Sequence, residues 1–311
     1  MVSEYSHQSV LLQQAVDALV TDPDGFYIDG TFGRGGHSRA ILERLSDQGR
    51  LLVVDKDAEA IKEACGLQKQ DKRLIVAHRS FADIADLAGI EHVTGRVAGV
   101  LLDLGVSSPQ LDDAARGFSF SKDGPLDMRM DTRGGMTAAQ WLASASEAEM
   151  ARVFFEYGEE KFSRRIARAI AEQRQQVALT GTLQLAELVK QAHPAWEKHK
   201  HPATRVFQAI RIFINAELQD LEVALAGIVD VLKTGGRLVV ISFHSLEDRL
   251  VKQFIQRQEK GDDYPPDMPV TQAQLHPRLK RVGRQLRASA TELADNIRAR
   301  SAVLRVAEKI A

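Results

Sequence analysis

Acidic residues and glycines that could hold a nucleotide-like cofactor lie close together near the start of the chain. Residues 26–38 read FYIDGTFGRGGHS, in which an apolar run ends at Asp29 and is followed by glycines at 30, 33, 35 and 36. A strand, a tight glycine turn and a helix N-terminus in this order present free backbone N–H groups to an anionic or polar cofactor. Asp55 ends the next apolar run, where a nucleotide-binding unit places the carboxylate that accepts hydrogen bonds from ribose hydroxyls.

Two cofactors fit this turn, NAD(P) for hydride transfer and S-adenosylmethionine for methyl transfer. Gly33, Gly35 and Ser38 have the spacing of the dinucleotide motif GxGxxG, but serine replaces the last glycine. Asp29 would repel a pyrophosphate in a partly dry cleft, whereas it suits a cofactor with a cationic amino-acid tail. The residues alone therefore favour methyl transfer and leave an NAD(P)-dependent oxidoreductase as the alternative.

The apolar runs define the elements that must position these residues. Four short runs alternate with helical segments, which predicts an α/β fold with a Rossmann-like, doubly wound parallel sheet of the class I methyltransferase type. In such a sheet the ligands bind at the carboxyl ends of the strands. The four runs are residues 26–29, 51–54, 74–77 and 97–102. A fifth strand is predicted at 237–242, and a closing hairpin at 279–289 and 301–308.

Other segments show helical periodicity. Residues 9–20 predict an amphipathic helix that covers one face of the sheet. The apolar residues from 207 to 232 advance by three or four positions, which predicts one long helix with Gly235 or Gly236 as its C-terminal cap. Ser245, followed three residues later by Asp248, is predicted to cap the next helix.

The alternation of strands and helices stops between residues 111 and 203. We therefore predict a methyltransferase domain formed by residues 1–112 and 204–311, interrupted by a helical insertion at 113–203. The stretch HKHPATR, at 199–205, is interpreted as the linker that returns to the first domain. The helices of the insertion are predicted near residues 138–157, 161–176 and 183–192.

Charge is unevenly distributed in a chain whose net charge is only −1. Lys and Arg number 10 against 3 Asp and Glu in residues 161–211, and 9 against 3 from residue 271 to the end. Two basic regions on a nearly neutral chain indicate a localised site for a polyanion. One predicted helix carries its cations on a single face, at Lys161, Arg164, Arg165 and Arg168.

The composition is typical of a globular protein that stays in the cytoplasm. No apolar run approaches the roughly 18 residues that a membrane span needs, and the first residues lack the pattern of a signal peptide. The single cysteine, Cys65, excludes an internal disulfide and is expected in the core. No metal site is expected, because His193, His199 and His201 lack partner carboxylates in a recognisable pattern.

Several long stretches match a known family. The chain closely resembles the RsmH (MraW) family of S-adenosylmethionine-dependent 16S ribosomal RNA cytosine-N4 methyltransferases, over essentially its whole length. The matching stretches are HQSVLLQQAV, IDGTFGRGGHS, LLDLGVSSPQLDDAARGFSF, DGPLDMRMD, YGEEKFSRRIARAI, HPATRVFQAIRIFIN, GGRLVVISFHSLEDR and RARSAVLRVAE.

The resemblance implies that the helical insertion at 113–203 binds RNA, and it also implies a substrate, a cofactor and a set of contacts. The substrate would be a cytosine in the decoding region of small-subunit ribosomal RNA, presented by an assembled or nearly assembled subunit. The cofactor would be S-adenosylmethionine, and its contacts would fall on Gly35, Gly36, His37, Asp55, Phe81, Asp103 and Gln110. The oligomeric state stays open, a homodimer included. A non-catalytic RNA-binding ribosome assembly factor is the alternative from a different class.

Methylation of a cytosine amine depends mainly on positioning. The lone pair of that amine is delocalised into the ring, so an acceptor that bonds its N–H and favours pyramidal nitrogen would help, together with in-line placement. The end of the fourth strand can supply that acceptor, and Asp103 and the backbone of residues 105–109 are the candidates. Asp103 is thus the predicted catalytic residue.

The residues that would contact the target base are less defined. Amino-methylating DNA enzymes often carry a D/N/S-P-P-aromatic motif at this strand end, and the chain has SSPQ instead. Base stacking would then fall to Phe118, Phe120 or Phe243. His244, at the end of the fifth strand, either contacts the substrate or only precedes the helix cap.

Overall fold

The computed structural model describes residues 9–195, 201–262 and 275–311, which form two compact units. Unit 1 comprises Met1–Gly105 and Leu218–Ala311, and unit 2 comprises Val106–Glu217. The expected boundaries at residues 112 and 203 differ from these, chiefly because α10 (Ala203–Ile214) packs into the core of unit 2. Within the described ranges no helix is long and apolar enough to cross a membrane.

Unit 1 contains a seven-stranded sheet in the order β3-β2-β1-β4-β5-β7-β6. The first five strands in the chain are parallel to one another. At one edge of the sheet β7 runs antiparallel to both of its neighbours, β5 and β6. This is the Rossmann-like fold that the alternating runs predict, and the four short runs and the fifth strand are confirmed. The strands are β1 (Phe26–Asp29), β2 (Arg50–Asp55), β3 (Leu74–His78), β4 (Val97–Asp103), β5 (Leu232–Ser242), β6 (Leu279–Arg281) and β7 (Val303–Lys309).

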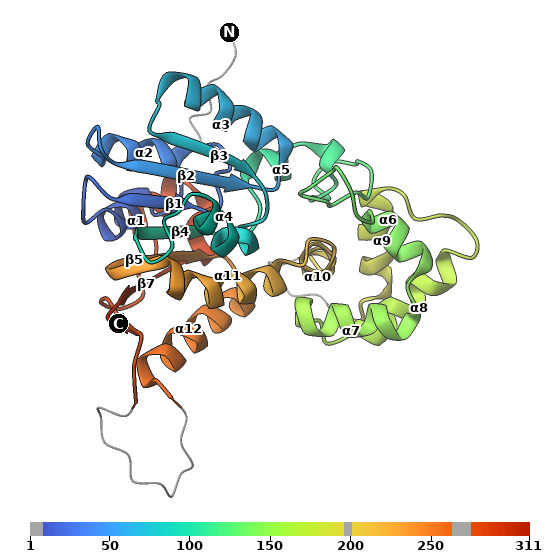
Figure 1. Ribbon diagram of the computed structural model, residues 1–311. Coiled ribbons are helices and arrows are strands. Elements are labelled where there is room, and N and C mark those ends of the chain that lie inside the picture. The colour runs from blue at the N-terminus through green and yellow to red at the C-terminus, as the bar shows by residue number, and fades with distance from the viewer. Residues whose placement is uncertain (1–8, 196–200, 263–274) are drawn as a thin grey trace, which may run out of the picture. The chain divides into compact units, whose positions relative to one another are not determined.

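Helices cover both faces of this sheet (Figure 1). Successive strand residues point to opposite faces, so Leu52 and Val54 enter one core while Leu51 and Val53 enter the other. The first core is completed by α4 (Ile84–Ile90), α11 (Glu217–Val231) and α12 (Ser245–Lys260). The second core is completed by α1 (Leu12–Leu19), α2 (Gly36–Arg44) and α3 (Ala58–Gln70). Cys65 on α3 is exposed, so its expected place in the core was wrong.

The predicted closing hairpin is confirmed as antiparallel pairing of β6 with β7. Its first arm is regular only at Leu279–Arg281, and an isolated bridge joins Leu286 to Leu304. Between the arms lie the short helix α13 (Ala290–Asp295) and the 3₁₀ turn Ile297–Ser301.

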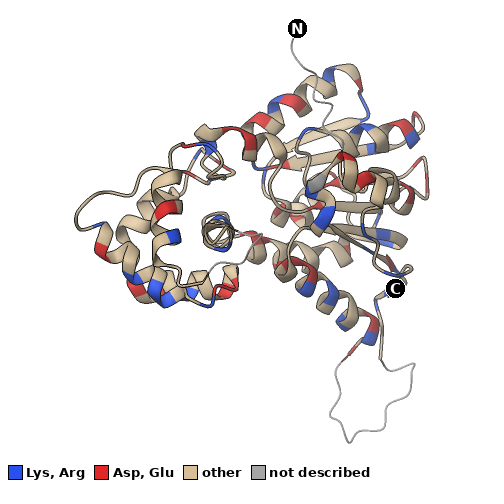
Figure 2. Cartoon of the chain, turned by 180° about the vertical axis from the view of Figure 1, so that it is seen from behind, with Lys and Arg blue, Asp and Glu red and all other residues tan. Residues whose placement is uncertain are grey.

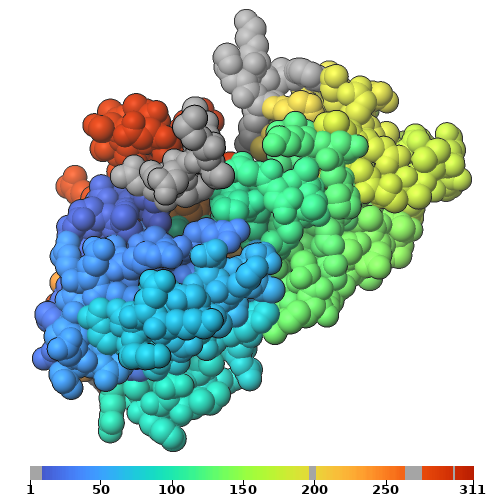
Figure 3. All heavy atoms as spheres, turned by 90° about the horizontal axis from the view of Figure 1, so that it is seen from above, coloured from blue at the N-terminus to red at the C-terminus, as the bar shows by residue number. Residues whose placement is uncertain are grey.

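Unit 2 is helical and has its own core, and its atoms, green to yellow in Figure 3, pack closely. The predicted helix at 138–157 is two helices, because Ser146 begins the second by accepting the Glu149 N–H. The Nε2 of His193 lies 3.5 Å from Oε1 of the fully buried Glu160. His193 therefore does have a partner carboxylate, which the sequence did not lead us to expect. The helices are α5 (Ser108–Asp112), α6 (Ala138–Ser144), α7 (Glu147–Gly158), α8 (Ser163–Gln173), α9 (Thr182–Ala192) and α10.

The predicted long helix over residues 207–232 is broken. α10 ends at Ile214 and α11 begins at Glu217, with Ala216 in the left-handed conformation at φ 51°. The cause lies outside the helix: the Asn215 amide donates to Met128 O (2.8 Å) and accepts from Met130 N (2.7 Å), which fixes its side chain on a loop. Helix α11 ends at Val231, and β5 begins at the next residue. Gly235 and Gly236 therefore lie within β5, and their predicted role as the helix cap is wrong.

The structure also differs from the return linker predicted at 199–205. Residues 199 and 200, with His199, lie outside the described residues, and Ala203 to Arg205 already belong to α10.

Candidate active site

The turn between β1 and α2 brings backbone close to other atoms at two glycines. Gly35 caps α2 in the left-handed conformation with φ 74°, and a Cβ there would lie 2.6 Å from the Phe32 ring. A Cβ on Gly36 would lie 2.0 Å from Ser9 Oγ. Any side chain at these positions would have to displace its neighbours, so the turn needs glycine at both.

Asp29 braces this turn from within the protein. Its side chain is 1% exposed, and its oxygens accept hydrogen bonds from Ser38 Oγ (2.5 Å) and Thr31 N (3.1 Å). Burial raises the pKa of Asp29 to about 6. In the sequence, Asp29 was the residue that favoured a cationic cofactor. In the structure its carboxyl holds the glycine turn through these two hydrogen bonds.

Asp55 holds the other side of the same turn. Gly33 N donates to its Oδ2 and Asp57 N to its Oδ1, both at 2.8 Å. Burial raises the pKa of Asp55. Each carboxylate oxygen can accept more than one hydrogen bond, so Asp55 keeps acceptor capacity for a ligand hydroxyl beside the turn.

His37 and Asp103 meet at the carboxyl end of β4. The His37 Nδ1 lies 3.5 Å from Asp103 Oδ2, and its Nε2 lies 3.2 Å from Val10 O. A carbonyl can only accept, so Nε2 carries the proton and Nδ1 turns its lone pair toward Asp103. Burial lowers the pKa of His37 to about 4, so this ring is neutral near pH 7.

Asp103 is a carboxyl in an unfavourable place for charge. Burial, and then the carboxyls of Asp29 and Glu247, raise its pKa well above the usual range. Its backbone N–H donates to Thr31 Oγ1 (2.6 Å), which fixes the strand end, while its Oδ1 is buried without a hydrogen-bond partner. The raised pKa favours the neutral form of Asp103, which faces a neutral His37.

Buried polar atoms without partners gather at the ends of β4 and β5. Of the four such side-chain atoms among the described residues, three lie here: Asp103 Oδ1, Ser242 Oγ and His244 Nε2. Each would cost about 1–3 kcal/mol if it stayed unsatisfied, so these strand ends offer polar atoms to a ligand. Ser242 was missed in the sequence, where a serine at a strand end carries no distinctive signal.

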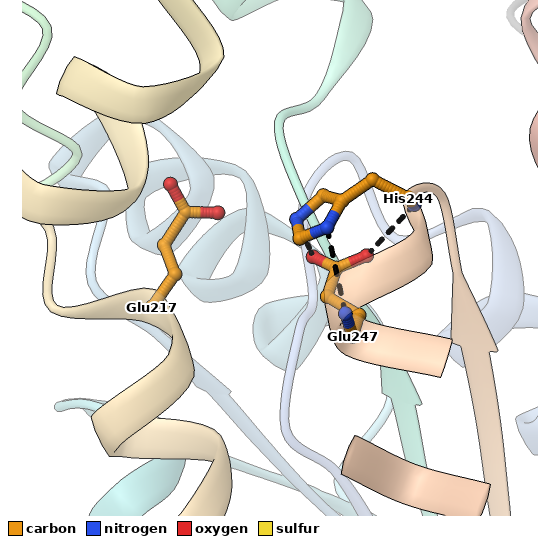
Figure 4. A group of neighbouring side chains, drawn as sticks. All are labelled: Glu217, His244 and Glu247. Atoms are coloured by element: carbon orange, nitrogen blue, oxygen red, sulfur yellow. Dashed lines mark hydrogen bonds and ion pairs between the residues drawn. The ribbon is translucent and has the colours of Figure 1, made fainter. Parts of the chain in front are cut away.

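His244 occupies the helix cap that the sequence assigned to Ser245. Its Nδ1 accepts from Glu247 N at 3.4 Å (Figure 4). Glu247 Oε2 also accepts from Phe243 N at 2.8 Å, and Ser245 is the first residue of α12. The His244 Nε2 lies 3.0 Å from Glu247 Oε1 without the alignment of a hydrogen bond. Glu217, also drawn in Figure 4, forms an ion pair with Arg211 (2.8 Å).

Comparison with known proteins decides the family. The model of the MraW methylase family matches residues 4–310. A protein of Chromohalobacter salexigens named ribosomal RNA small subunit methyltransferase H is 60% identical over 99% of this chain and 93% of its own length. A protein of the same name from Marinomonas sp. is 54% identical over 98% and 97%. The chain belongs to the MraW methylase family.

Membership in this family decides against the oxidoreductase alternative and fits the resemblance seen in the sequence. A solved rRNA methylase from Streptococcus thermophilus also aligns over 96% of this chain and 92% of its own, at 10% identity and a TM-score of 0.42. The cofactor of the family is S-adenosylmethionine, which supplies an electrophilic methyl group on a sulfonium. The residues present fit this molecule, because Asp55 keeps acceptor capacity for ribose hydroxyls and the buried Oδ1 of Asp103 has no hydrogen-bond partner.

The remaining predicted contacts of this methylase occupy different surroundings. Phe81 follows β3, half-buried beside the turn, where a Cβ on Gly30 would lie 3.1 Å from its own Cβ. The Lys56 ammonium lies 6.0 Å from the centre of the Phe81 ring and is paired with Asp220. Gln110 lies in unit 2, where its side-chain oxygen accepts from Ser107 N at 2.9 Å and forms part of the capping box of α5.

Proposed function

We propose that this protein transfers a methyl group from S-adenosylmethionine to the exocyclic N4 amine of a cytosine in the decoding region of 16S ribosomal RNA. The names of the two relatives support the class of substrate, a small-subunit ribosomal RNA. The specificity for N4 of cytosine rests on the resemblance and on the chemistry of the strand ends. The substrate would be the RNA within an assembled or nearly assembled subunit.

The observation that carries the proposal is the buried Oδ1 of Asp103, at the end of β4, which has no hydrogen-bond partner. An amine whose lone pair is delocalised needs an acceptor that bonds one N–H and favours pyramidal nitrogen. Asp103 is held for this role by its backbone bond to Thr31. A cationic cofactor beside it would lower its raised pKa and favour the carboxylate, which is the form that accepts.

The cofactor contacts inferred from the resemblance have separate tasks. The backbone at Gly35 and Gly36 would approach the cofactor closely, Asp55 would accept from ribose hydroxyls, and Phe81 would pack on the adenine ring. The His37 ring, neutral and fixed by Val10, would keep Asp103 in place. The full set that we propose is Gly35, Gly36, His37, Asp55, Phe81, Asp103 and Gln110.

Among the aromatic residues, Phe243 suits base stacking best. Phe118 is 6% exposed and belongs to the core of unit 2. Phe120 already packs against Phe207 with ring centres 4.8 Å apart. Phe243 is only partly buried and follows Ser242 directly, next to the unpartnered atoms of β5. A target base that has left its stack could be held there.

RNA backbone would be held by the exposed face of α8 in unit 2, whose cations are blue in Figure 2. This helix buries Ile166 and Ile170 and exposes Arg164 and Arg165, which make no ion pair among the described residues. Arg168 pairs with Glu147 at 3.6 Å. Phosphate contacts of this kind give affinity and orientation and leave the choice of base to the site.

The proposed function is tested with radiolabelled S-adenosylmethionine and small ribosomal subunits that lack the modification. We expect label in the RNA with the wild-type protein, and a turnover about 10²–10³-fold lower with Asp103→Asn, which keeps the shape and removes the carboxylate. Asp86→Asn, at an exposed acid on α4, should leave turnover unchanged. Absence of label with the wild-type protein would refute the proposal.

A further inference from the structure

A basic groove lies in unit 1 on the side of α12 next to the end of the sheet. It is a shallow groove that runs between α12 and the segment that follows β6. Four of its lining residues are cationic, and none is acidic or aromatic. The lining residues on which the following steps depend are Lys252, Gln256, Arg281, Arg284, Gln285 and Arg305.

Two of the four cations are held in fixed positions by carboxylates behind them. Arg305 donates to both oxygens of Asp248, at 2.7 and 3.0 Å, and also to Gln285 Oε1 at 2.7 Å. Arg281 pairs with Glu259 through its Nε at 2.7 Å, and the Arg281 backbone N–H donates to the same carboxylate. These pairs reduce the local charge but orient the guanidinium groups before any ligand arrives.

The other two cations have no such partner. Lys252 on α12 and Arg284 after β6 are exposed, and neither makes an ion pair among the described residues. Four cations against two carboxylates leave the groove with a net positive charge that a bound anion would neutralise. Arg284, like Arg281 and Arg305, belongs to the second basic region of the sequence, from residue 271 onward, which the proposed active site does not use, and Lys252 joins them from α12.

We infer that this groove binds the phosphate backbone of the substrate RNA, an inference that rests on the proposed function. The chemistry points to phosphate, because every charged residue of the lining is an arginine or a lysine and no aromatic side chain offers a surface for base stacking. Contacts of this kind carry no sequence information and depend strongly on salt. The groove therefore adds affinity and orientation to the RNA complex, and plays no part in the chemical step.

The test reverses the two unpaired charges in the full-length protein with Lys252→Glu and Arg284→Glu combined. The probe is a transcript of small-subunit ribosomal RNA, whose dissociation constant is measured over a range of salt concentrations. We expect binding weaker by about tenfold or more, and a salt dependence shallower by about 1.4 in slope, since each single-strand phosphate contact contributes about 0.7. Arg257→Glu, at an exposed cation of α12 outside the groove lining, is the matched control and should bind as wild type.

The outcomes separate this inference from the proposed function. If the double variant and Arg257→Glu had equal RNA affinity and equal salt dependence, the groove would not be a phosphate-binding site. That conclusion would hold even if the wild-type protein methylates small subunits. If the double variant lost binding to polyglutamate but kept its RNA affinity, the groove would bind an acidic protein and not RNA, which would also refute the inference. A double variant that binds S-adenosylmethionine normally and loses RNA affinity supports it, because the fold and cofactor site are then intact.

Discussion

The pair formed by His37 and Asp103 shows how one buried histidine sets the charge of a site. The Val10 carbonyl accepts a hydrogen bond from His37 Nε2, so Nε2 carries the proton of the neutral ring. The Nδ1 of that ring then turns its lone pair toward Asp103. The neutral ring and the raised pKa of Asp103 are consistent with one another, since burial disfavours both charges. The family resemblance indicated His37, and both the end of the fourth strand and the resemblance indicated Asp103, but only the folded arrangement brings the two side chains within 3.5 Å.

This arrangement makes a prediction about stability and pH. The pKa of His37 falls from 6.5 to about 4 on folding, so the unfolded chain binds more protons between these values and folding stability is lost as pH falls through that window. From pH 7 to pH 5 the loss due to His37 should be about 2 kcal/mol. Asp29, whose pKa rises to about 6, has the opposite effect, being stabilising on the acid side.

The measurement compares urea unfolding of the wild-type protein and His37→Gln at pH 7 and pH 5. The free-energy difference between the two proteins should shrink by about 2 kcal/mol at the lower pH, because only the wild type must keep a histidine neutral. The contribution of Asp29 is common to both proteins and cancels. A difference that is the same at both pH values would show that His37 is not held neutral.

At the scale of elements, the break between α10 and α11 is the clearest case of tertiary structure overriding sequence pattern. The apolar spacing continues through the break, so local sequence predicts one helix. The hydrogen bonds of Asn215 to Met128 and Met130 instead place Ala216 in a left-handed turn. As a result Phe207 and Ile210 serve the core of unit 2, and Leu221 and Leu225 serve the sheet.

We predict that Asn215→Ala destabilises unit 2 by about 3 kcal/mol. The substitution leaves the Met130 N–H and the Met128 carbonyl without their partners, and each lost partner of a buried polar group costs about 1–3 kcal/mol. The matched control is Asn296→Ala, which removes a hydrogen bond to Arg298 N in a turn of unit 1. Protection of unit 2 amides in hydrogen exchange checks this, and unchanged protection would mean that the break has another cause.

Strands were more predictable than helix ends. The strands of the parallel sheet are buried on both faces, so their apolar runs are continuous in the sequence and need no tertiary information. The cap of α12 was assigned to Ser245 and not to His244, because serine is the more common cap and the bond of His244 Nδ1 to Glu247 N is visible only in three dimensions. The unpartnered Ser242 hydroxyl was equally invisible in the sequence.

For the whole molecule, a net charge of −1 hides two basic surfaces, the exposed face of α8 and the groove beside α12. The sequence predicted both regions from local charge counts. It could not predict which cations remain unpaired, because Arg168, Arg281 and Arg305 find carboxylates only in the fold.

We predict that Arg164→Glu combined with Arg165→Glu weakens binding to small-subunit RNA by about tenfold or more, because two phosphate contacts are replaced by repulsion. Binding of S-adenosylmethionine should be unchanged, since these residues belong to unit 2 and the proposed cofactor turn belongs to unit 1. Titration of both ligands measures this, with Lys69→Glu on α3 as the control. Equal RNA affinity in all three proteins would remove α8 from the RNA interface.

The most direct test of the central claim identifies the methylated atom. Small subunits lacking the modification are incubated with the protein and methyl-labelled S-adenosylmethionine, and the RNA is digested to nucleosides for mass spectrometry. We predict that the label appears as N4-methylcytidine from the decoding region, and that Asp103→Asn abolishes most of it. Label on cytosine carbon, on another base or on ribose would contradict the assignment of the target amine.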